Sequence, residues 1–351
     1  MSVSRRIACL LLVLIATVAP LAAAAEPPAK YVIHISVDGL NPTHLNELLK
    51  AGEVPTFARL QAEGAWTHNA RTDFDYTNTL PNHTCMVTCR PVMDKEAEPS
   101  AISGHMWRHN SDPEDRTLHT ERRDYIKSAF DVAHDHGLRT GMFVSKSKFV
   151  LYDLSYNERT GAPDTDGEDN GRDKIDVYYQ SSLTPIMTKE FLKAMDEQPI
   201  HYCFVHFRDT DTAGHATGWG SPAYNNALKQ VDRQLGRILE LVTTDERFKD
   251  QTAIVLSADH GGTGRNHGVN SNPLNYTIPF YVWGAGAAKG KDLYALNEQT
   301  RTDPKSARQD YIGRTRQPIR NGDGGNLALH LLGLGPIPGS LINAAQDLAA
   351  H

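Results

Sequence analysis

Carboxylate and imidazole side chains follow three apolar runs of the sequence. The three groups are Asp38 after residues 31–37, Asp211 with His215 after residues 200–207, and Asp259 with His260 after residues 252–258. In an open α/β sheet, ligands bind outside the carboxyl ends of the strands. Taken singly, each group is more often a turn or a surface pair. Together they predict that five side chains, distant in sequence, gather at one edge of a sheet as oxygen and nitrogen ligands for a metal.

A threonine in the segment "TLPNH" (79–83) adds a hydroxyl to this set. Pro81 suits the first turn of a helix, where its missing N–H costs nothing. The segment therefore predicts a loop that delivers Thr79 to a helix N-terminus, where backbone N–H groups attract an anion. A threonine at such a position is usually a cap. Beside a ligand cluster it is a candidate nucleophile for a phosphate, and His83 falls inside the helix.

Alternating strand and helix patterns run through the sequence and would position these groups. Predicted strands cover residues 31–37, 139–145, 200–207, 252–258 and 278–284, and predicted helices cover residues 54–64, 124–137, 184–198 and 224–242. Several strand runs are apolar on both faces, which is typical of a mostly parallel sheet with helices on both sides. No internal repeat or linker is found, so residues 26–351 are predicted to form one α/β domain. The polar, Gly-rich segment 157–174 is predicted to be an exposed loop rather than a calcium-binding one.

The first 25 residues have the features of a secretory signal peptide. Arg5 and Arg6 precede an apolar run, and small residues end it near Ala25. We therefore expect an exported protein, periplasmic or secreted, and no later segment is apolar enough to span a bilayer. The formal net charge of −6 provides no general field for binding a nucleic-acid polymer. An odd number of cysteines outside the signal peptide argues against a disulfide scaffold.

The segments "VDGL", "TLPNH", "DTAGH" and "SADHGG", in this order, resemble the motifs of the alkaline phosphatase superfamily. The closest branch is the type I phosphodiesterase/nucleotide pyrophosphatase group. The resemblance covers most of the chain and implies an alkaline phosphatase-like three-layer sandwich with two divalent metal ions. It assigns one ion to Asp38, Thr79, Asp259 and His260, and the other to Asp211, His215 and a further histidine. We favour His267 as that histidine, with His330 as the competitor, although His330 falls in an apolar helix pattern.

Aspartate and histidine ligands without cysteine suit zinc, and they do not exclude manganese or iron. Two metal ions can clamp the attacking and leaving oxygens of a displacement at phosphorus. Metal coordination would also activate the Thr79 hydroxyl, so that a phosphothreonine intermediate forms and is then hydrolysed. The sequence thus predicts an exported, metal-dependent phosphoric ester hydrolase of phosphodiesterase type, acting on a small phosphate ester. The alternatives are a phosphomonoesterase or phosphonate hydrolase and, in another class, a binding protein that keeps the metals without turnover.

Three further residues are candidates for holding the substrate. Where the pyrophosphatase branch uses an asparagine for a phosphoryl oxygen, this sequence offers His105, with Asn110 five residues later. Lys146 and Lys148 follow a predicted strand. Some phosphomonoesterase and phosphonate-cleaving relatives use such a pair to bind a second charged group, although lysines at a strand end are just as often solvated. His105, Lys146 and Lys148 are therefore predicted substrate-binding residues.

Overall fold

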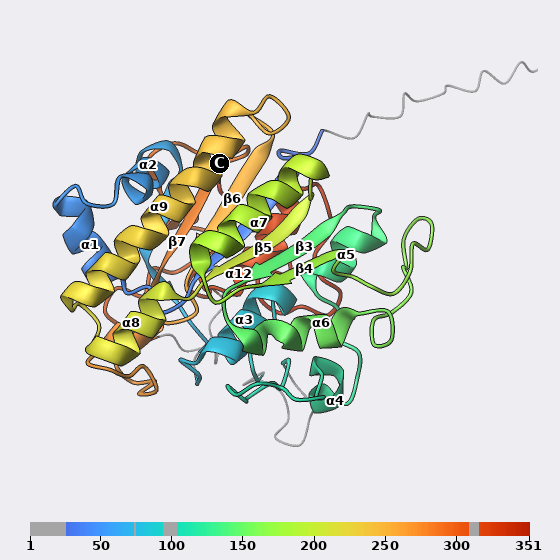
Figure 1. Cartoon of the computed structure of the whole chain (residues 1–351), viewed down its shortest axis with the longest axis horizontal. Coiled ribbons are helices and arrows are strands. Elements are labelled where there is room, and N and C mark those ends of the chain that lie inside the picture. Colours follow the sequence, from blue (N-terminus) through green and yellow to red (C-terminus); the bar gives the residue numbers. More distant parts are fainter. Residues whose placement is uncertain (1–25, 74, 94–103, 309–315) are drawn as a thin grey trace, which may run out of the picture.

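The computed structural model describes residues 26–73, 75–93, 104–308 and 316–351, so the predicted signal peptide lies outside the described residues. The described strands form one sheet with the order β4-β3-β5-β1-β6-β7-β2-β8 (Figure 1). Their bounds are β1 (Tyr31–Val37), β2 (Ala65–Arg71), β3 (Thr140–Val144), β4 (Val177–Gln180), β5 (Tyr202–Phe207), β6 (Thr252–Ser257), β7 (Thr277–Gly284) and β8 (Lys291–Asp292). Among these strands β7 alone is antiparallel to both of its neighbours. The sheet is therefore mostly parallel.

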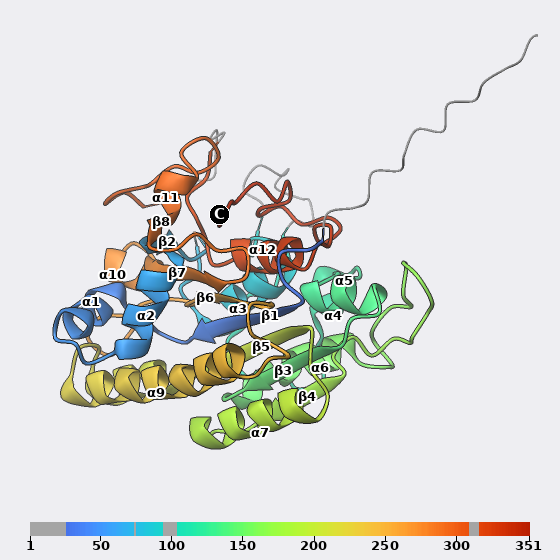
Figure 2. The ribbon, with the colours of Figure 1, turned by 90° about the horizontal axis from the view of Figure 1, so that it is seen from above.

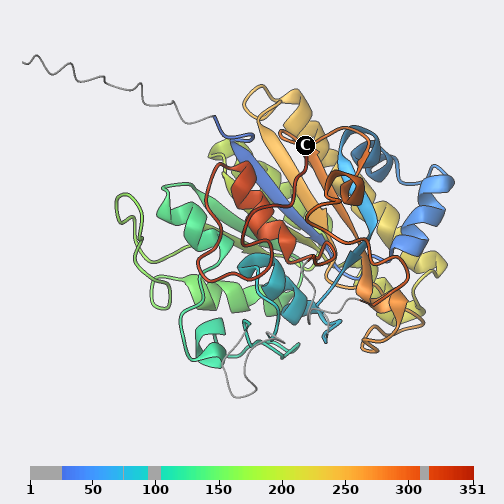
Figure 3. The same ribbon diagram turned by 180° about the vertical axis from the view of Figure 1, so that it is seen from behind.

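Helices cover both faces of this sheet, as Figure 2 shows along its edge. One layer holds α2 (Pro55–Glu63), α7 (Thr184–Glu197) and α9 (Pro222–Thr244), and the opposite layer holds α3 (Thr79–Thr88), α5 (Ala129–Asp135) and α12 (Asp323–Leu331). Figure 3 shows α12 and α3 lying over the second face. The remaining α-helices are α1 (Pro42–Lys50), α4 (Leu118–Arg122), α6 (Val150–Tyr156), α8 (Asp209–Thr217), α10 (Pro273–Tyr276) and α11 (Leu293–Leu296). This arrangement confirms the predicted three-layer α/β fold.

Local sequence explains where these elements form. Every residue of β1, β5 and β6 is buried, because helices pack on both sides of the central strands. Helix α9 begins where the Ser221 hydroxyl accepts a hydrogen bond from the Tyr224 N–H, with Pro222 at its first position. Its buried residues recur at helical spacing and pack on the sheet, from Leu228 to Val242. Helix α2 also begins with a proline, Pro55, but no side chain caps it.

The predicted elements and the structure agree best in the centre of the sheet. The five predicted strands correspond to β1, β3, β5, β6 and β7, and three of the four predicted helices match α2, α7 and α9. The helix predicted at 124–137 is shorter, because Ser128 and Asp131 form a capping box that begins α5 at Ala129. Strands β2, β4 and β8 were not predicted. Segment 157–174 contains no helix or strand, as predicted. Within the described residues, no helix has the length and apolar character needed to cross a membrane.

Candidate metal and phosphoryl-transfer site

The predicted ligands lie together because the strands that carry them are neighbours. Strand β1 pairs with β5 on one side and with β6 on the other, parallel in both cases. Asp38 follows β1 directly, α8 carries Asp211 and His215 just after β5, and Asp259 and His260 follow β6. Two hydrogen bonds connect the three strand ends: Asp211 N–H donates to the Asp38 carbonyl (3.0 Å), and Gly39 N–H donates to Asp259 Oδ1 (3.0 Å).

The predicted ligands form two overlapping groups. In the first, ligand atoms of Asp211, His215 and His267 all lie within 4.8 Å of one another. His215 Nε2 lies 3.3 Å from Asp211 Oδ1 and 3.1 Å from His267 Nε2. His267 Nε2 lies 3.7 Å from the same carboxylate oxygen. The structure thus brings His267 into this group, whereas His330 lies near the end of α12.

The second group contains Asp38, Asp211 and His260, again with ligand atoms within 4.8 Å. His260 Nε2 lies 3.5 Å from Asp38 Oδ1 and 3.2 Å from Asp259 Oδ2. Asp211 therefore belongs to both groups, which places them side by side. We call the six residues together the ligand cluster: Asp38, Asp211, His215, Asp259, His260 and His267.

Backbone carbonyl groups fix the orientation of all three histidines in the ligand cluster. The Nδ1 atom of His215 lies 3.0 Å from the Arg265 carbonyl oxygen, and that of His260 lies 2.8 Å from the Gly261 carbonyl oxygen. His267 Nδ1 pairs with the Thr77 carbonyl oxygen. A carbonyl oxygen only accepts, so each ring donates from Nδ1 and turns its Nε2 toward the ligand cluster. That is the arrangement of a metal-ligating histidine with an outer hydrogen bond.

The charge balance of the cluster also fits divalent cations. Four buried atoms of the ligand cluster have no hydrogen-bond partner: Asp38 Oδ1, Asp211 Oδ1, Asp259 Oδ2 and His260 Nε2. They are the same atoms that face one another across the two groups. Burial and the Asp38 carboxylate raise the pKa of Asp259 well above its ordinary value. Burial lowers the pKa of His260 to about 3. Buried, unpaired ligand atoms of this kind are costly unless a cation binds them.

Thr79 is the first residue of α3 and is buried beside the ligand cluster. His83 holds this end of the helix: its Nδ1 donates to the Thr79 carbonyl (2.8 Å), and its Nε2 accepts from the Ser36 hydroxyl of β1 (2.8 Å). The same Nδ1 lies 3.5 Å from Asp259 Oδ2. The loop before α3 also contacts His267, through the Thr77 carbonyl. Thr79 thus stands at the N-terminus of a helix, as the sequence predicted, and residues near it in the chain contact Asp259 and His267.

The three predicted substrate-binding residues occupy different surroundings. Lys146 Nζ lies 2.6 Å from Asp38 Oδ2 and 2.6 Å from Asp211 Oδ2. The two carboxylates raise the pKa of Lys146 against the opposing effect of its burial. Lys148 Nζ donates to Asn110 Oδ1 (3.1 Å). Lys146 therefore reaches the ligand cluster, whereas Lys148 contacts Asn110.

His105 does not reach the site. Its ring is fully buried beside α3, where Nε2 lies 3.4 Å from Cys85 Sγ and Nδ1 accepts from the Trp107 N–H (3.1 Å). Asn110 takes the position expected of His105, because Asn110 Oδ1 accepts from the Leu80 N–H at the start of α3 (3.1 Å). The prediction for His105 was wrong because the loop after α3 buries its ring beside Cys85 and brings Asn110, instead, to the start of α3.

Sequence reasoning missed one partner of the ligand cluster. His206 on β5 donates from Nε2 to Asp38 Oδ2 (3.0 Å) and is fully buried. Its proton faces the carboxylate, so His206 orients Asp38 rather than offering a lone pair to a metal. The signal available in the sequence was a histidine inside an otherwise apolar strand. Its target lies 168 residues away and becomes visible only in the pairing of β1 with β5.

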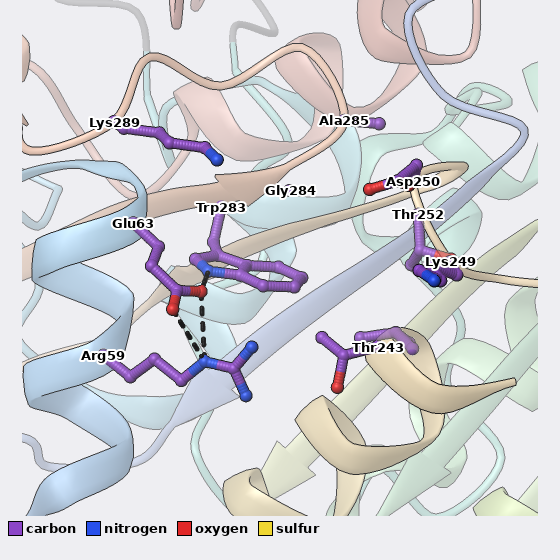
Figure 4. A pocket seen from close by; sticks show the side chains of 11 residues that line it. Arg59, Glu63, Thr243, Lys249, Asp250, Thr252, Trp283, Gly284, Ala285 and Lys289 are labelled. Carbon is purple, nitrogen blue, oxygen red and sulfur yellow. Dashed lines mark hydrogen bonds and ion pairs between the residues drawn. The ribbon is translucent and has the colours of Figure 1, made fainter.

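A separate cavity of about 290 Å³ lies at the opposite edge of the sheet, where β6 begins and β7 ends. Figure 4 shows Arg59 and Trp283 both directed at Glu63 in its wall. Arg59 Nε lies 3.0 Å from Glu63 Oε2, and Trp283 Nε1 donates to the same oxygen (3.1 Å). These polar groups satisfy one another, so we assign this cavity no role in the chemistry.

The fold and the ligand cluster define an α/β protein with a candidate metal site made of two adjacent ligand groups. The family model described as type I phosphodiesterase / nucleotide pyrophosphatase matches residues 32–311, and the chain belongs to this family. Similar solved structures include murine ectonucleotide pyrophosphatase/phosphodiesterase 5, an inactive variant in complex with AMP, with a TM-score of 0.59, 14% identity and coverage of 91% of this chain and 99% of that one. The lipoteichoic acid synthase LtaP from Listeria monocytogenes matches with a TM-score of 0.56 and 14% identity, over 93% of this chain and 75% of that one. These structures support the alkaline phosphatase-like fold.

Curated relatives carry a different activity in their names. GPI ethanolamine phosphate transferase 1 from Yarrowia lipolytica is 24% identical over 93% of this chain and 35% of its own length. The mouse protein of the same name is 25% identical over 74% of this chain and 27% of its own length. The chain thus spans about a third of the length of these relatives. The family match supports phosphodiesterase-type activity.

Proposed function

We propose that this protein is an exported, metal-dependent phosphoric ester hydrolase that acts on small phosphodiesters through a covalent intermediate on Thr79. The observation that carries the proposal is the convergence of unpaired ligand atoms beside the N-terminus of α3. Asp38, Asp259 and His260 would hold one divalent cation next to Thr79, and Asp211, His215 and His267 would hold the other. Aspartate and histidine ligands favour zinc. Bound cations of this kind stabilise negative charge on the attacking and leaving oxygens.

The chain's own residues supply the nucleophile and the orientation. The Thr79 hydroxyl gives its proton to solvent and attacks phosphorus, the P–O bond to the leaving alcohol breaks, that alcohol takes a proton from solvent, and a phosphothreonine diester remains. Water then attacks that phosphorus, the bond to Thr79 Oγ1 breaks and this oxygen regains a proton, and a phosphomonoester departs. Asn110 Oδ1 already accepts from the Leu80 N–H, so its amide N–H₂ is left to donate to a phosphoryl oxygen. Donors fixed in this way stabilise charge as it develops.

The two lysines favour a second candidate function, a phosphomonoesterase or phosphonate hydrolase. Lys146 contacts Asp211 and Lys148 contacts Asn110, and a dianionic monoester gains more from nearby ammonium groups than a monoanionic diester does. The names of the curated relatives raise a related question, because a transferase passes the phosphoryl group to an alcohol instead of water. We propose water as the acceptor for this chain.

One assay series tests these proposals on the purified, zinc-loaded protein. A bis-aryl phosphate diester, an aryl phosphate monoester and an aryl phosphonate are compared by kcat/KM, and the diester reaction is repeated with added ethanolamine. The proposal expects the diester to be the best substrate, with an aryl phosphate and the free phenol as its products. If kcat/KM were much larger for the monoester or the phosphonate than for the diester, the second candidate function would replace the proposed one. Phosphoethanolamine products would make the protein a transferase, and no turnover of any ester would leave a metal-binding protein.

A further inference from the structure

One indole, that of Trp219, lies against all three loops that carry the ligand cluster. Trp219 follows α8 and is only 8% exposed. A glycine stands next to the predicted ligands in each loop: Gly39 after Asp38, Gly214 before His215, and Gly262 after the Asp259–His260–Gly261 turn. All three glycines touch the same indole. These loops come from three different strands, and one side chain contacts them together.

The contacts leave no room for a larger residue at these positions. A β-carbon placed on Gly262 would lie 2.1 Å from Trp219 Cε2, and one on Gly214 would lie 2.6 Å from Cδ2. A β-carbon on Gly39 would lie 3.1 Å from Cζ2, and this glycine also has a φ of +70°. Glycine permits such close approach of a backbone to a ring. Glycine at positions 39, 214 and 262 therefore allows the backbone to pack directly against the Trp219 ring.

Hydrogen bonds and ring contacts connect Trp219 to the candidate ligands. Its Nε1 donates to the Gly39 carbonyl (2.8 Å), and its backbone N–H donates to the Gly264 carbonyl (2.8 Å). The rings of His215 and His267 both meet the indole edge to face, with centroids 5.3 Å and 5.9 Å away. The indole thus packs against both imidazoles of the first ligand group. It also donates a hydrogen bond to Gly39, the residue that follows Asp38 of the second group.

We infer that Trp219 is a positioning residue that fixes the His215 and His267 imidazoles relative to the Asp38, Asp259 and His260 group. The inference rests on the proposed metal site. Removal of the indole would leave a cavity where the three loops meet, and the two imidazoles would lose the surface that orients them. Loss of an outer partner of a ligand weakens metal binding by about 10- to 100-fold. The effect should fall on the cation held by Asp211, His215 and His267.

This inference is tested by titrating zinc into the chelator-treated full chain and measuring the binding heat by calorimetry. The wild type is expected to bind two zinc ions. Trp219→Ala should weaken one of them by at least about tenfold, and Trp219→Phe should restore most of the loss because it keeps an aromatic ring. Trp283→Ala is the matched control, since Trp283 is equally buried at 8% exposure but lines the remote cavity. It should leave both affinities unchanged.

A second variant pair separates positioning from simple loss of core packing. Gly214 lies within α8, where alanine would normally favour the helix over glycine. Gly214→Ala should nevertheless weaken zinc binding in the wild type, because its methyl group meets the indole, and it should do little further harm in Trp219→Ala. Equal zinc affinities for the wild type and Trp219→Ala would overturn the inference alone. A wild type that binds no zinc would overturn the metal site, and with it both proposals.

Discussion

Two buried clusters of carboxylates, imidazoles and lysines occur in the described chain, and they are neutralised in different ways. The first, which we call the loop cluster, consists of Lys127, His134, Asp135, Asp164 and Lys174. Lys174 is fully buried and pairs with Asp135 (3.2 Å) and with Asp164. Lys127 pairs with the other oxygen of Asp135 (2.6 Å), and His134 pairs with Asp164 (2.8 Å). Two carboxylates therefore meet two ammonium groups.

The ligand cluster has the same residue types without that balance. Its three carboxylates, Asp38, Asp211 and Asp259, share the ammonium group of Lys146, and each retains an oxygen without a hydrogen-bond partner. No carboxylate of the loop cluster has such an oxygen. The comparison shows that acidic and histidine residues alone do not indicate a metal site. Unpaired ligand atoms and uncompensated charge do, because a cation must then supply what the protein does not.

The largest expected effect is the loss of turnover when the hydroxyl of Thr79, the proposed nucleophile, is removed. Thr79→Ala should lower kcat by about three orders of magnitude or more, because Thr79 carries the hydroxyl of the first helical position, whereas the Thr77 hydroxyl already donates to the His267 carbonyl. The zinc content should stay near that of the wild type, since Asp38, Asp259 and His260 remain. Metal analysis and steady-state kinetics on the same preparation measure both. Thr88→Ala is the matched control, a buried hydroxyl of α3 that donates to the Thr84 carbonyl. Wild-type turnover by Thr79→Ala would remove the nucleophile from the mechanism.

The loop cluster should respond in stability and not in zinc binding. Lys174→Met leaves Asp135 and Asp164 buried with too little positive charge, which costs roughly 3–5 kcal/mol of unfolding free energy. Urea unfolding with circular dichroism measures the loss. Lys193→Met removes an exposed pair with Glu197 and should change stability by less than about 1 kcal/mol. Stabilisation of the wild type by added calcium would contradict our view that Lys174 is the counterion of segment 157–174.

A similar contrast separates the strands and site residues that could be predicted from the sequence from those that could not. The strands that carry Asp38, Asp211 and Asp259 were predictable because both faces of each strand are buried and leave long apolar runs. The short strand β4 borders the sheet with partly exposed residues, so it produces no comparable run. A residue such as His206 acts through a strand pairing that no local pattern encodes.

The loop after α3 shows the other limit. His105 and Asn110 are five residues apart, and only the path of the backbone decides which one reaches the Leu80 N–H. The Lys174 pairing likewise depends on a fold-back of segment 157–174 onto α5. Spacing in the sequence identified the ligands that follow strands, but it could not identify partners that meet across loops.

The ligand assigned last, His267, has a smaller expected effect. His267→Ala should weaken one of the two zinc ions by about 10- to 100-fold or more, because Asp211 and His215 then bind it with one imidazole fewer. His330→Ala should instead cost stability, since His330 lies in α12 over the sheet. Zinc titration and thermal unfolding on both variants separate the two effects. If His330→Ala lost the metal and His267→Ala kept it, the third ligand of this group would be His330.

The smallest effect concerns the lysine that does not touch the ligand cluster's carboxylates. Lys148 donates to Asn110, which in turn accepts from the Leu80 N–H, so its charge lies next to the expected phosphoryl oxygens. A hydrogen bond to a charged group is worth about 1.5–3 kcal/mol. Lys148→Met should therefore lower kcat/KM for an aryl phosphate monoester by about tenfold or more, and lower it less for the monoanionic diester. Equal losses on both substrates would mean that Lys148 only orders Asn110, and the difference between the two candidate functions would then rest on Lys146.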